Sequence, residues 1–464
     1  MKVGHYIMRV LPRIPLYGAI RRGRLRATRP LTLTFSVTGA CQSRCKTCHI
    51  GSRYLDNPRI AAANLSPDEI EAVFRSVGPV YFFNVSGGEP FMRPDLAEVV
   101  RLACRHLRPQ LIHIPTNGIA PRFIVRTTRE ILAHMDELLP ASVPLSVKPS
   151  IDGIGSAHDA VRGFEGNFAL LERSIDGLLE LRRKHPRLHV DLGTVISNWN
   201  LEHLDAIERW VHGRGVQSYR HEIAEQRAEF HNLGDPITPT ADVYRGLIGR
   251  FKARIRHNIA GKRRLTRITE AVRLVYYDVA ADILEQRRQV SACYAGTSNV
   301  HLNYDGELWP CCVLGGEQSM GNVRDSNYDV LELLRSSRAQ AARAFIAAKR
   351  CACPLANQWL TNVLLTPRHM MRVAWTLAAM TFVRQEAGEA EDIDPVPAAD
   401  NTGRREALRS ARYGILGEPE WIEFGAAEEL VPRARRPFVM PRQQGEAPRQ
   451  GQRESSAEDR RGQA

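Results

Sequence analysis

Six strand-like runs alternate with helix-like segments between residues 31 and 225, and this alternation limits the folds open to the chain. A serine at position 66, followed by Pro67 and two acids, marks a typical helix start. Repeated strand–helix units build a parallel sheet with right-handed crossovers, and such folds place their sites after the strands. The six predicted strands are residues 31–37, 80–85, 111–115, 144–151, 188–196 and 217–223.

Three cysteines follow the first predicted strand directly, as Cys41, Cys45 and Cys48 in a Cys-x3-Cys-x2-Cys pattern. Three thiolates on one tight loop can hold three irons of a 4Fe–4S cluster and leave the fourth iron without a protein ligand. An open metal position can bind a substrate, as it does in catalytic zinc sites. The loop therefore indicates chemistry rather than electron transfer alone.

Two other uses of these thiols compete with a cluster. Clustered cysteines in an intracellular chain are more often metal ligands than disulfides. A zinc knuckle would need a fourth ligand, for which His49 is available, but a Cys-His pair of adjacent residues chelates one ion poorly. Both alternatives rank below the cluster.

The cysteine loop resembles the cluster motif of the radical S-adenosylmethionine (radical SAM) superfamily. The resemblance implies a partial (β/α)6 barrel, and six strand–helix units are indeed fewer than the eight of a closed barrel. One position departs from the family pattern, because Thr47 stands where an aromatic residue is usual. That departure affects packing near the adenine and leaves cluster ligation unchanged.

The resemblance also implies a set of S-adenosylmethionine contacts, all of which follow predicted strands. The Gly-Gly-Glu-Pro turn after the second strand would hold the methionine amino group, and polar residues after the fourth would face the ribose and carboxylate. The predicted contacts are Gly87, Gly88, Glu89, Pro90, Thr116, Asn117, Ser150, Asp152, Arg162 and Asn198. Two of these residues also have simpler interpretations. Asn117 could belong to an ordinary Asn-Gly turn, and Arg162 could be a solvated arginine at a helix end.

A second cysteine group lies between residues 291 and 356, around a predicted hairpin with its turn at Asp305 and Gly306. It resembles the twitch and SPASM extensions of radical SAM enzymes, which hold auxiliary 4Fe–4S clusters. The implied ligands are Cys293, Cys311, Cys351 and Cys353, with Cys312 as an alternative to Cys311. The closing pair is Cys-x-Cys where Cys-x2-Cys is commoner, and a structural zinc ribbon is the competing interpretation.

The remaining segments complete the predicted organisation, an α/β barrel with a small α+β cysteine-containing domain and a disordered tail. The predicted parts are a basic N-terminal arm (1–30), the core barrel (31–225), a helical connector (226–290), the auxiliary-cluster domain (291–356), an amphipathic helical segment (357–386) and a mostly disordered tail (387–464).

The formal net charge of +13 does not predict nucleic-acid binding, because the arginines are spread without an aromatic platform. No run approaches the roughly 18 apolar residues of a membrane span. We expect a cytoplasmic protein. The basic arm and the helix near residues 368–375 could instead contact a membrane surface, or pack against the barrel.

These features predict an enzyme that cleaves S-adenosylmethionine reductively to a 5′-deoxyadenosyl radical and abstracts hydrogen from a peptide, a lipid, or a small alcohol or sugar. The auxiliary cluster would carry electrons, and a ferredoxin or flavodoxin would supply the reductant. Either oxidation or formation of a C–C or C–S bond would suit this chemistry. The alternative function is a non-catalytic iron–sulfur electron carrier or zinc scaffold, which would have no need of the Gly-Gly-Glu-Pro turn.

Overall fold

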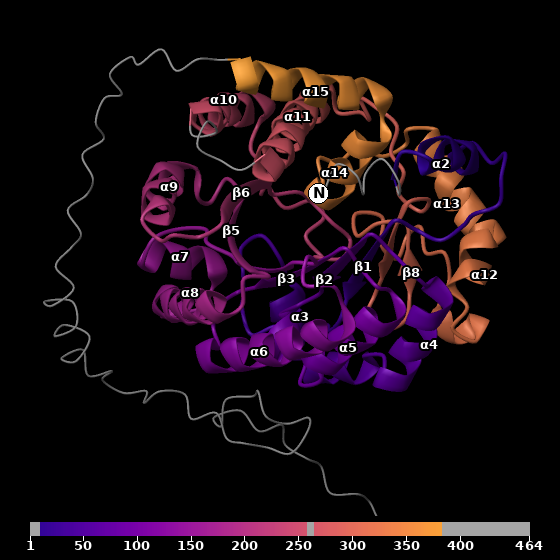
Figure 1. Ribbon diagram of the computed structural model, residues 1–464, viewed down its shortest axis with the longest axis horizontal. Coiled ribbons are helices and arrows are strands. Elements are labelled where there is room, and N and C mark those ends of the chain that lie inside the picture. The colour runs from indigo at the N-terminus through magenta and orange to yellow at the C-terminus, as the bar shows by residue number, and fades with distance from the viewer. Residues whose placement is uncertain (1–9, 258–263, 383–464) are drawn as a thin grey trace, which may run out of the picture. The chain divides into compact units, whose positions relative to one another are not determined.

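Eight strands form one sheet in the order β6-β5-β4-β3-β2-β1-β7-β8 in a computed structural model that describes residues 10–257 and 264–382 (Figure 1). Strands β1 to β6 pair in parallel with their sequence neighbours, and β6 does not close onto β1. The predicted partial barrel is therefore confirmed. The strands are β1 Thr32–Ser36, β2 Phe82–Ser86, β3 Leu111–Thr116, β4 Leu145–Pro149, β5 Leu188–Ile196, β6 Ser218–Ile223, β7 Asn299–Leu302 and β8 Leu308–Trp309.

Helices cover the outer face of this sheet because alternate strand residues are apolar on that side. Phe74 of α4 packs edge-on between Phe35 of β1 and Phe83 of β2, with ring centroids 6.0 and 5.5 Å apart. The N-terminus of α4 has the predicted cap, a reciprocal pair between Ser66 and Glu69. The helices of the barrel are α3 Ile50–Asp56, α4 Pro67–Val77, α5 Leu96–His106, α6 Pro121–Leu138, α7 Ser156–Arg162, α8 Asn167–Lys184 and α9 Leu204–His212.

The second cysteine group extends the same sheet. The predicted hairpin forms as antiparallel β7 and β8, with Gly306 at a φ of 90° in its turn. Strand β7 also pairs in parallel with β1, a long-range pairing that the sequence did not indicate. Helices α12 Val330–Arg335 and α13 Ser337–Ala347 follow the hairpin.

A second apolar core lies between the β5–β6 end of the barrel and four helices that follow it, and it includes Phe251, Tyr277, Trp359 and Val373. These helices are α10 Ala241–His257, α11 Arg264–Gln286, α14 Ala356–Leu365 and α15 Pro367–Phe382. No helix in the described part of the chain is long and apolar enough to cross a membrane. The predicted disordered tail lies outside the described residues.

The N-terminal arm forms helix α2, Arg13–Arg21, and contacts the second cysteine group directly. The Arg21 Nε donates a 2.9 Å hydrogen bond to the carbonyl oxygen of Cys293. Tyr17 and Ile20 are buried in the main core. This part of the arm thus packs against the body of the protein.

Candidate active site

The three cysteines after β1 lie together on one loop, and none forms a disulfide. Burial and the neighbouring Cys45 thiol raise the pKa of Cys41 well above its usual value, and the same two causes raise the pKa of Cys48 to about 12. Neighbouring buried thiols resist ionisation until a cation joins them, so this donor set fits a metal centre. The Nε2 of His49, the residue next to Cys48, lies 2.7 Å from the carboxylate of Asp235.

Backbone contacts hold this cysteine loop from both sides. The backbone N–H of Lys46 donates to the carbonyl of Val161 in α7 at 2.9 Å, and the backbone N–H of His49 donates to the carbonyl of Phe230 at 2.9 Å. The Asn232 amide donates to the carbonyl of Thr47 at 2.8 Å. The loop is therefore fixed by α7 on one side and the segment after β6 on the other.

The Gly-Gly-Glu-Pro turn lies against the same loop. The backbone N–H groups of Gly88 and Glu89 donate to the carbonyls of Thr38 and Ala40, each at 2.8 Å. A Cβ added at Gly88 would lie 2.1 Å from the Ala40 carbonyl oxygen, a distance that no side chain tolerates. Glycine is thus required here by the close approach of two backbones.

Glu89 is buried with 3% of its surface exposed, and its carboxylate joins the turn to β3. It accepts hydrogen bonds from the Thr116 hydroxyl at 2.8 Å, the Asn117 backbone N–H at 2.7 Å and the Phe91 backbone N–H at 3.2 Å. Burial nevertheless raises the pKa of Glu89 to about 7. The Asn117 amide in turn donates to Gln42 and Ser43 of the cysteine loop, at 3.2 and 3.3 Å. The structure therefore brings the residues predicted after β2 and β3 together with the cysteines.

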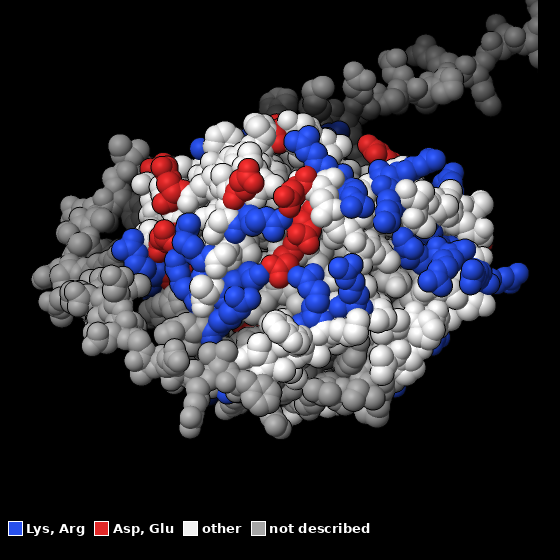
Figure 2. Space-filling view, turned by 90° about the horizontal axis from the view of Figure 1, so that it is seen from above, with Lys and Arg blue, Asp and Glu red and all other residues white. Residues whose placement is uncertain are grey.

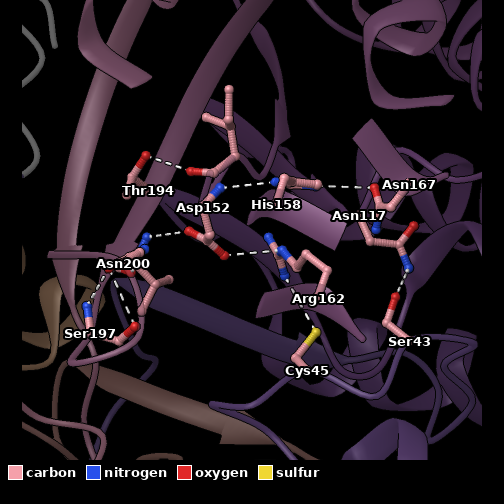
Figure 3. A network of polar contacts seen from close by, with 12 residues as sticks. Ser43, Cys45, Asn117, Asp152, His158, Arg162, Asn167, Thr194, Ser197 and Asn200 are labelled. Atoms are coloured by element: carbon pink, nitrogen blue, oxygen red, sulfur yellow. Dashed lines mark hydrogen bonds and ion pairs between the residues drawn. The ribbon is translucent and has the colours of Figure 1, made fainter. Parts of the chain in front are cut away.

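Arg162 links the end of β4 to the cysteine loop, as Figure 3 shows. Its guanidinium lies 3.0 Å from the Asp152 carboxylate and 3.7 Å from the Sγ of Cys45. Arg162 lies at the end of the short helix α7, but its side chain is only 13% exposed, so it is not a solvated helix-end arginine. The Asp152 backbone N–H donates to His158 Nδ1 at 3.1 Å, and the Asp152 carboxylate accepts from the Val195 N–H at 2.9 Å.

Two further predicted contacts, Asn198 and Ser150, have hydrogen-bond partners outside the cysteine loop. The side-chain amide of Asn198 donates to the carbonyl of Pro236 at 2.8 Å, so it is engaged with the segment after β6. Ser150 hydrogen-bonds through its backbone N–H to Thr116 at 2.9 Å, which ties β4 to β3. The structure gives neither side chain a contact with the cysteine loop.

The second cysteine group gathers residues that are far apart in sequence. Burial raises the pKa of Cys311 to about 12, and the neighbouring thiols of Cys293 and Cys351 add to the shift. Burial also raises the pKa of Cys353 well above its usual value, and Cys311 and Cys293 are again among the neighbouring groups that add to it. The loop after α13 is fixed by the Trp359 indole, which donates to the Cys353 carbonyl at 2.6 Å. All four thiols are free and fit a fully ligated metal centre.

Cys312 faces a different environment from its neighbour Cys311. It lies beside Arg227 and Glu229 in the segment after β6, and its ligand atom lies within 4.8 Å of those of Glu229 and His301. The Arg227 guanidinium pairs with Glu225 at 2.9 Å. Cys312 therefore belongs to a polar group that the sequence did not single out.

This polar group lines a small pocket that also reaches Cys311. The Ser36 hydroxyl donates to Glu229 at 2.6 Å and lies 2.7 Å from His301 Nε2, so the imidazole nitrogen is the donor in that second contact. One oxygen of Glu229 and the Nε of Arg227 are buried without a hydrogen-bond partner. Buried polar atoms of this kind usually form hydrogen bonds to water or to a ligand. The side chains around these two atoms are suited to a polar ligand.

Family models match both cysteine groups. The radical SAM superfamily model matches residues 35–211, and the model of an iron–sulfur cluster-binding domain, SPASM, matches residues 293–354. The chain belongs to the radical SAM superfamily. Enzymes of this family use S-adenosylmethionine (SAM) and a 4Fe–4S cluster, and the SPASM match adds an auxiliary cluster domain.

The alignments with curated radical SAM relatives cover only part of each relative's length. The subtilosin biosynthesis protein AlbA of Bacillus subtilis is 22% identical over 65% of this chain and 59% of that protein. The mycofactocin maturase MftC of Mycolicibacterium smegmatis is 32% identical over 47% of this chain and 50% of that protein. This chain thus spans about half the length of these relatives. Streptococcus suis SuiB, solved with its precursor peptide SuiA, shares the fold with a TM-score of 0.50 and 14% identity, over 71% of this chain and 70% of that one.

Proposed function

We propose that this chain cleaves SAM reductively at a 4Fe–4S cluster held by Cys41, Cys45 and Cys48, and abstracts a hydrogen atom from an organic substrate. The observation that carries the proposal is the contact between the three-thiol loop and the Gly-Gly-Glu-Pro turn. An electron carrier would not need a buried carboxylate beside its cluster. When bound, SAM supplies a 5′-deoxyadenosyl radical, the species that takes the hydrogen atom.

The chain's own residues would bind and orient the cofactor. Glu89 offers a buried carboxylate for the methionine amino group, and the Thr116 and Asn117 contacts fix its position. Arg162 would pair with the methionine carboxylate, since it already lies between Asp152 and the cysteine loop. Burial of these groups excludes water from the reacting centre.

A second 4Fe–4S cluster would be held by Cys293, Cys311, Cys351 and Cys353, with no open position. Four thiolate ligands suit electron transfer, so this cluster would accept or return one electron during the reaction. The pocket lined by Arg227, Glu229 and His301 reaches Cys311. A substrate in this pocket would therefore have a short path to the second cluster.

The pocket lining favours a substrate with polar groups around its reacting carbon. It combines buried acceptors, such as Glu229, with buried donors, such as Arg227. Peptide amides offer both partners, and AlbA acts in the biosynthesis of a bacteriocin. We therefore favour peptide modification over a hydrocarbon or a simple alcohol as the reaction.

The test uses protein that is reconstituted anaerobically and then reduced. Mass spectrometry measures whether it forms 5′-deoxyadenosine and methionine. Wild-type protein should form both products from SAM, and the Cys45→Ala variant should form neither. Protein that contains its full iron and sulfide but never cleaves SAM would overturn the proposal and favour an electron carrier.

A further inference from the structure

Helix α15 presents a hydrophobic stripe to solvent. Met371 and Trp375 are 67% and 76% exposed, the highest values among the large hydrophobic side chains described. Ala374 and Ala378 are also exposed, and the spacing of these four residues places them on one face of the helix. The opposite face, with His369 and Val373, is buried against the second core.

Basic residues outnumber acids on α15 itself and on the nearby helix α10. Helix α15 contains Arg368 and Arg372 and no acid, and Arg372 pairs with Asp278 of α11 at 3.1 Å. Helix α10 carries five basic residues and one acid, and it packs beside α11, which contacts α15. Three of the five, Arg245, Lys252 and Arg254, pair with acids of α11 or α9, and Arg250 and Arg256 add positive charge beyond these pairs. Figure 2 shows the upper side of Figure 1, where these helices lie, with groups of Lys and Arg on both sides of a central group of Asp and Glu.

We propose that this face docks on the surface of an anionic lipid membrane. A Trp and a Met beside arginines suit the membrane interface, because the apolar side chains enter the headgroup boundary while the cations meet anionic lipids. Each basic residue near such a surface contributes about 1 kcal/mol of attraction. The helix lies flat on the protein with its apolar stripe outward, which is the geometry of an interfacial helix.

A second copy of the chain fits the exposed face of α15 less well than an anionic membrane does. A stable protein interface buries about 800 Å² on each partner, and two protruding side chains on one convex helix cannot supply that area. Two copies would also bring the same arginines face to face. The positive charge therefore selects a negatively charged surface.

The test is co-sedimentation of the full-length, cluster-loaded protein with vesicles of phosphatidylglycerol and phosphatidylcholine, compared with pure phosphatidylcholine. Binding should require the anionic lipid and should weaken at high salt. The double variant Met371→Ser and Trp375→Ser should bind about tenfold more weakly. Leu233→Ser, which alters a 56% exposed leucine outside this face, should bind like wild type.

Fluorescence gives a second measurement that does not depend on the serine variants. Brominated lipid should quench part of the tryptophan emission, and Trp375→Phe should remove that part while the protein still sediments with vesicles. Failure to bind anionic vesicles, or equal binding by the double variant, would overturn the proposal. So would a dimer in solution that the double variant abolishes. None of these outcomes depends on SAM cleavage.

Discussion

The guanidinium of Arg162 lies 3.7 Å from the Sγ of Cys45. The same group pairs with Asp152 at 3.0 Å, so one side chain joins the end of β4 to the cysteine loop (Figure 3). Burial raises the pKa of Asp152, and Arg162 opposes that shift. The pair therefore couples the stability of the loop to the position of a residue that we propose to contact SAM.

Replacing Arg162 by Met should leave the buried Asp152 without a cation. Breaking a buried pair from one side costs about 3–5 kcal/mol, so we expect a clearly lower anaerobic melting temperature. Adding Asp152→Asn to this variant should recover part of that loss, because the uncompensated charge is gone. A double variant no more stable than the single one would contradict the ion pair.

Glu89 should make SAM binding depend on pH. Its pKa is raised to about 7, so the carboxylate that attracts the amino group is present above pH 7 and lost below it. Affinity should fall as the pH drops from 8 to 6, by up to about tenfold per unit below the pKa. Isothermal titration of the cluster-loaded protein would measure this. The Glu89→Gln variant should bind weakly with a flatter profile, and an unchanged profile would exclude Glu89.

Gly88→Ala should disrupt the contact between the Gly-Gly-Glu-Pro turn and the cysteine loop. The new Cβ would meet the Ala40 carbonyl at 2.1 Å, so one of the two backbones must move. We expect loss of SAM binding and a reduced yield of the first cluster. Gly246→Ala in α10, where a Cβ meets nothing within 4 Å, is the matched control and should retain both. Normal SAM binding by the Gly88→Ala variant would contradict the requirement for glycine at this contact between two backbones.

Cys312 and Cys353 should differ in their effect on iron content. Cys353 faces Cys311 and Cys293, whereas Cys312 faces Arg227 and Glu229. Cys353→Ser should therefore lose most of the second cluster, and Cys312→Ser should keep it. Iron and sulfide analysis with electron paramagnetic resonance would show the difference. Loss of iron in the Cys312 variant alone would make that residue the ligand.

Local signals in the sequence predicted the barrel strands well. The fifth predicted strand, residues 188–196, matches β5 residue for residue, because its apolar run is bounded by clear turn signals. The cap at Ser66 also appears as predicted, since capping depends on neighbours within four residues. The contacts of Glu89 could be anticipated only through the family resemblance.

Long-range pairings escaped prediction. The pairing of β7 with β1 joins residues more than 260 positions apart, and a hairpin motif says nothing of its neighbour in the sheet. The polar group of Ser36, Glu229 and His301 comes from three distant segments, each with one ordinary polar residue. The amide of Asn198 donates to the segment after β6, a contact that its place after a strand did not indicate. Each of these three arrangements depends on tertiary contacts between segments that are far apart in the sequence.

The most direct test of two separate clusters, of which one binds SAM, is iron analysis with electron paramagnetic resonance on two variants. Replacing Cys41, Cys45 and Cys48 together should lower the iron content from about eight to about four atoms per chain and remove any spectral change on adding SAM. Replacing Cys293, Cys311, Cys351 and Cys353 should also leave about four, with the SAM-dependent change retained. Complete loss of iron in the first variant, or a SAM response that survives in it, would contradict the assignment.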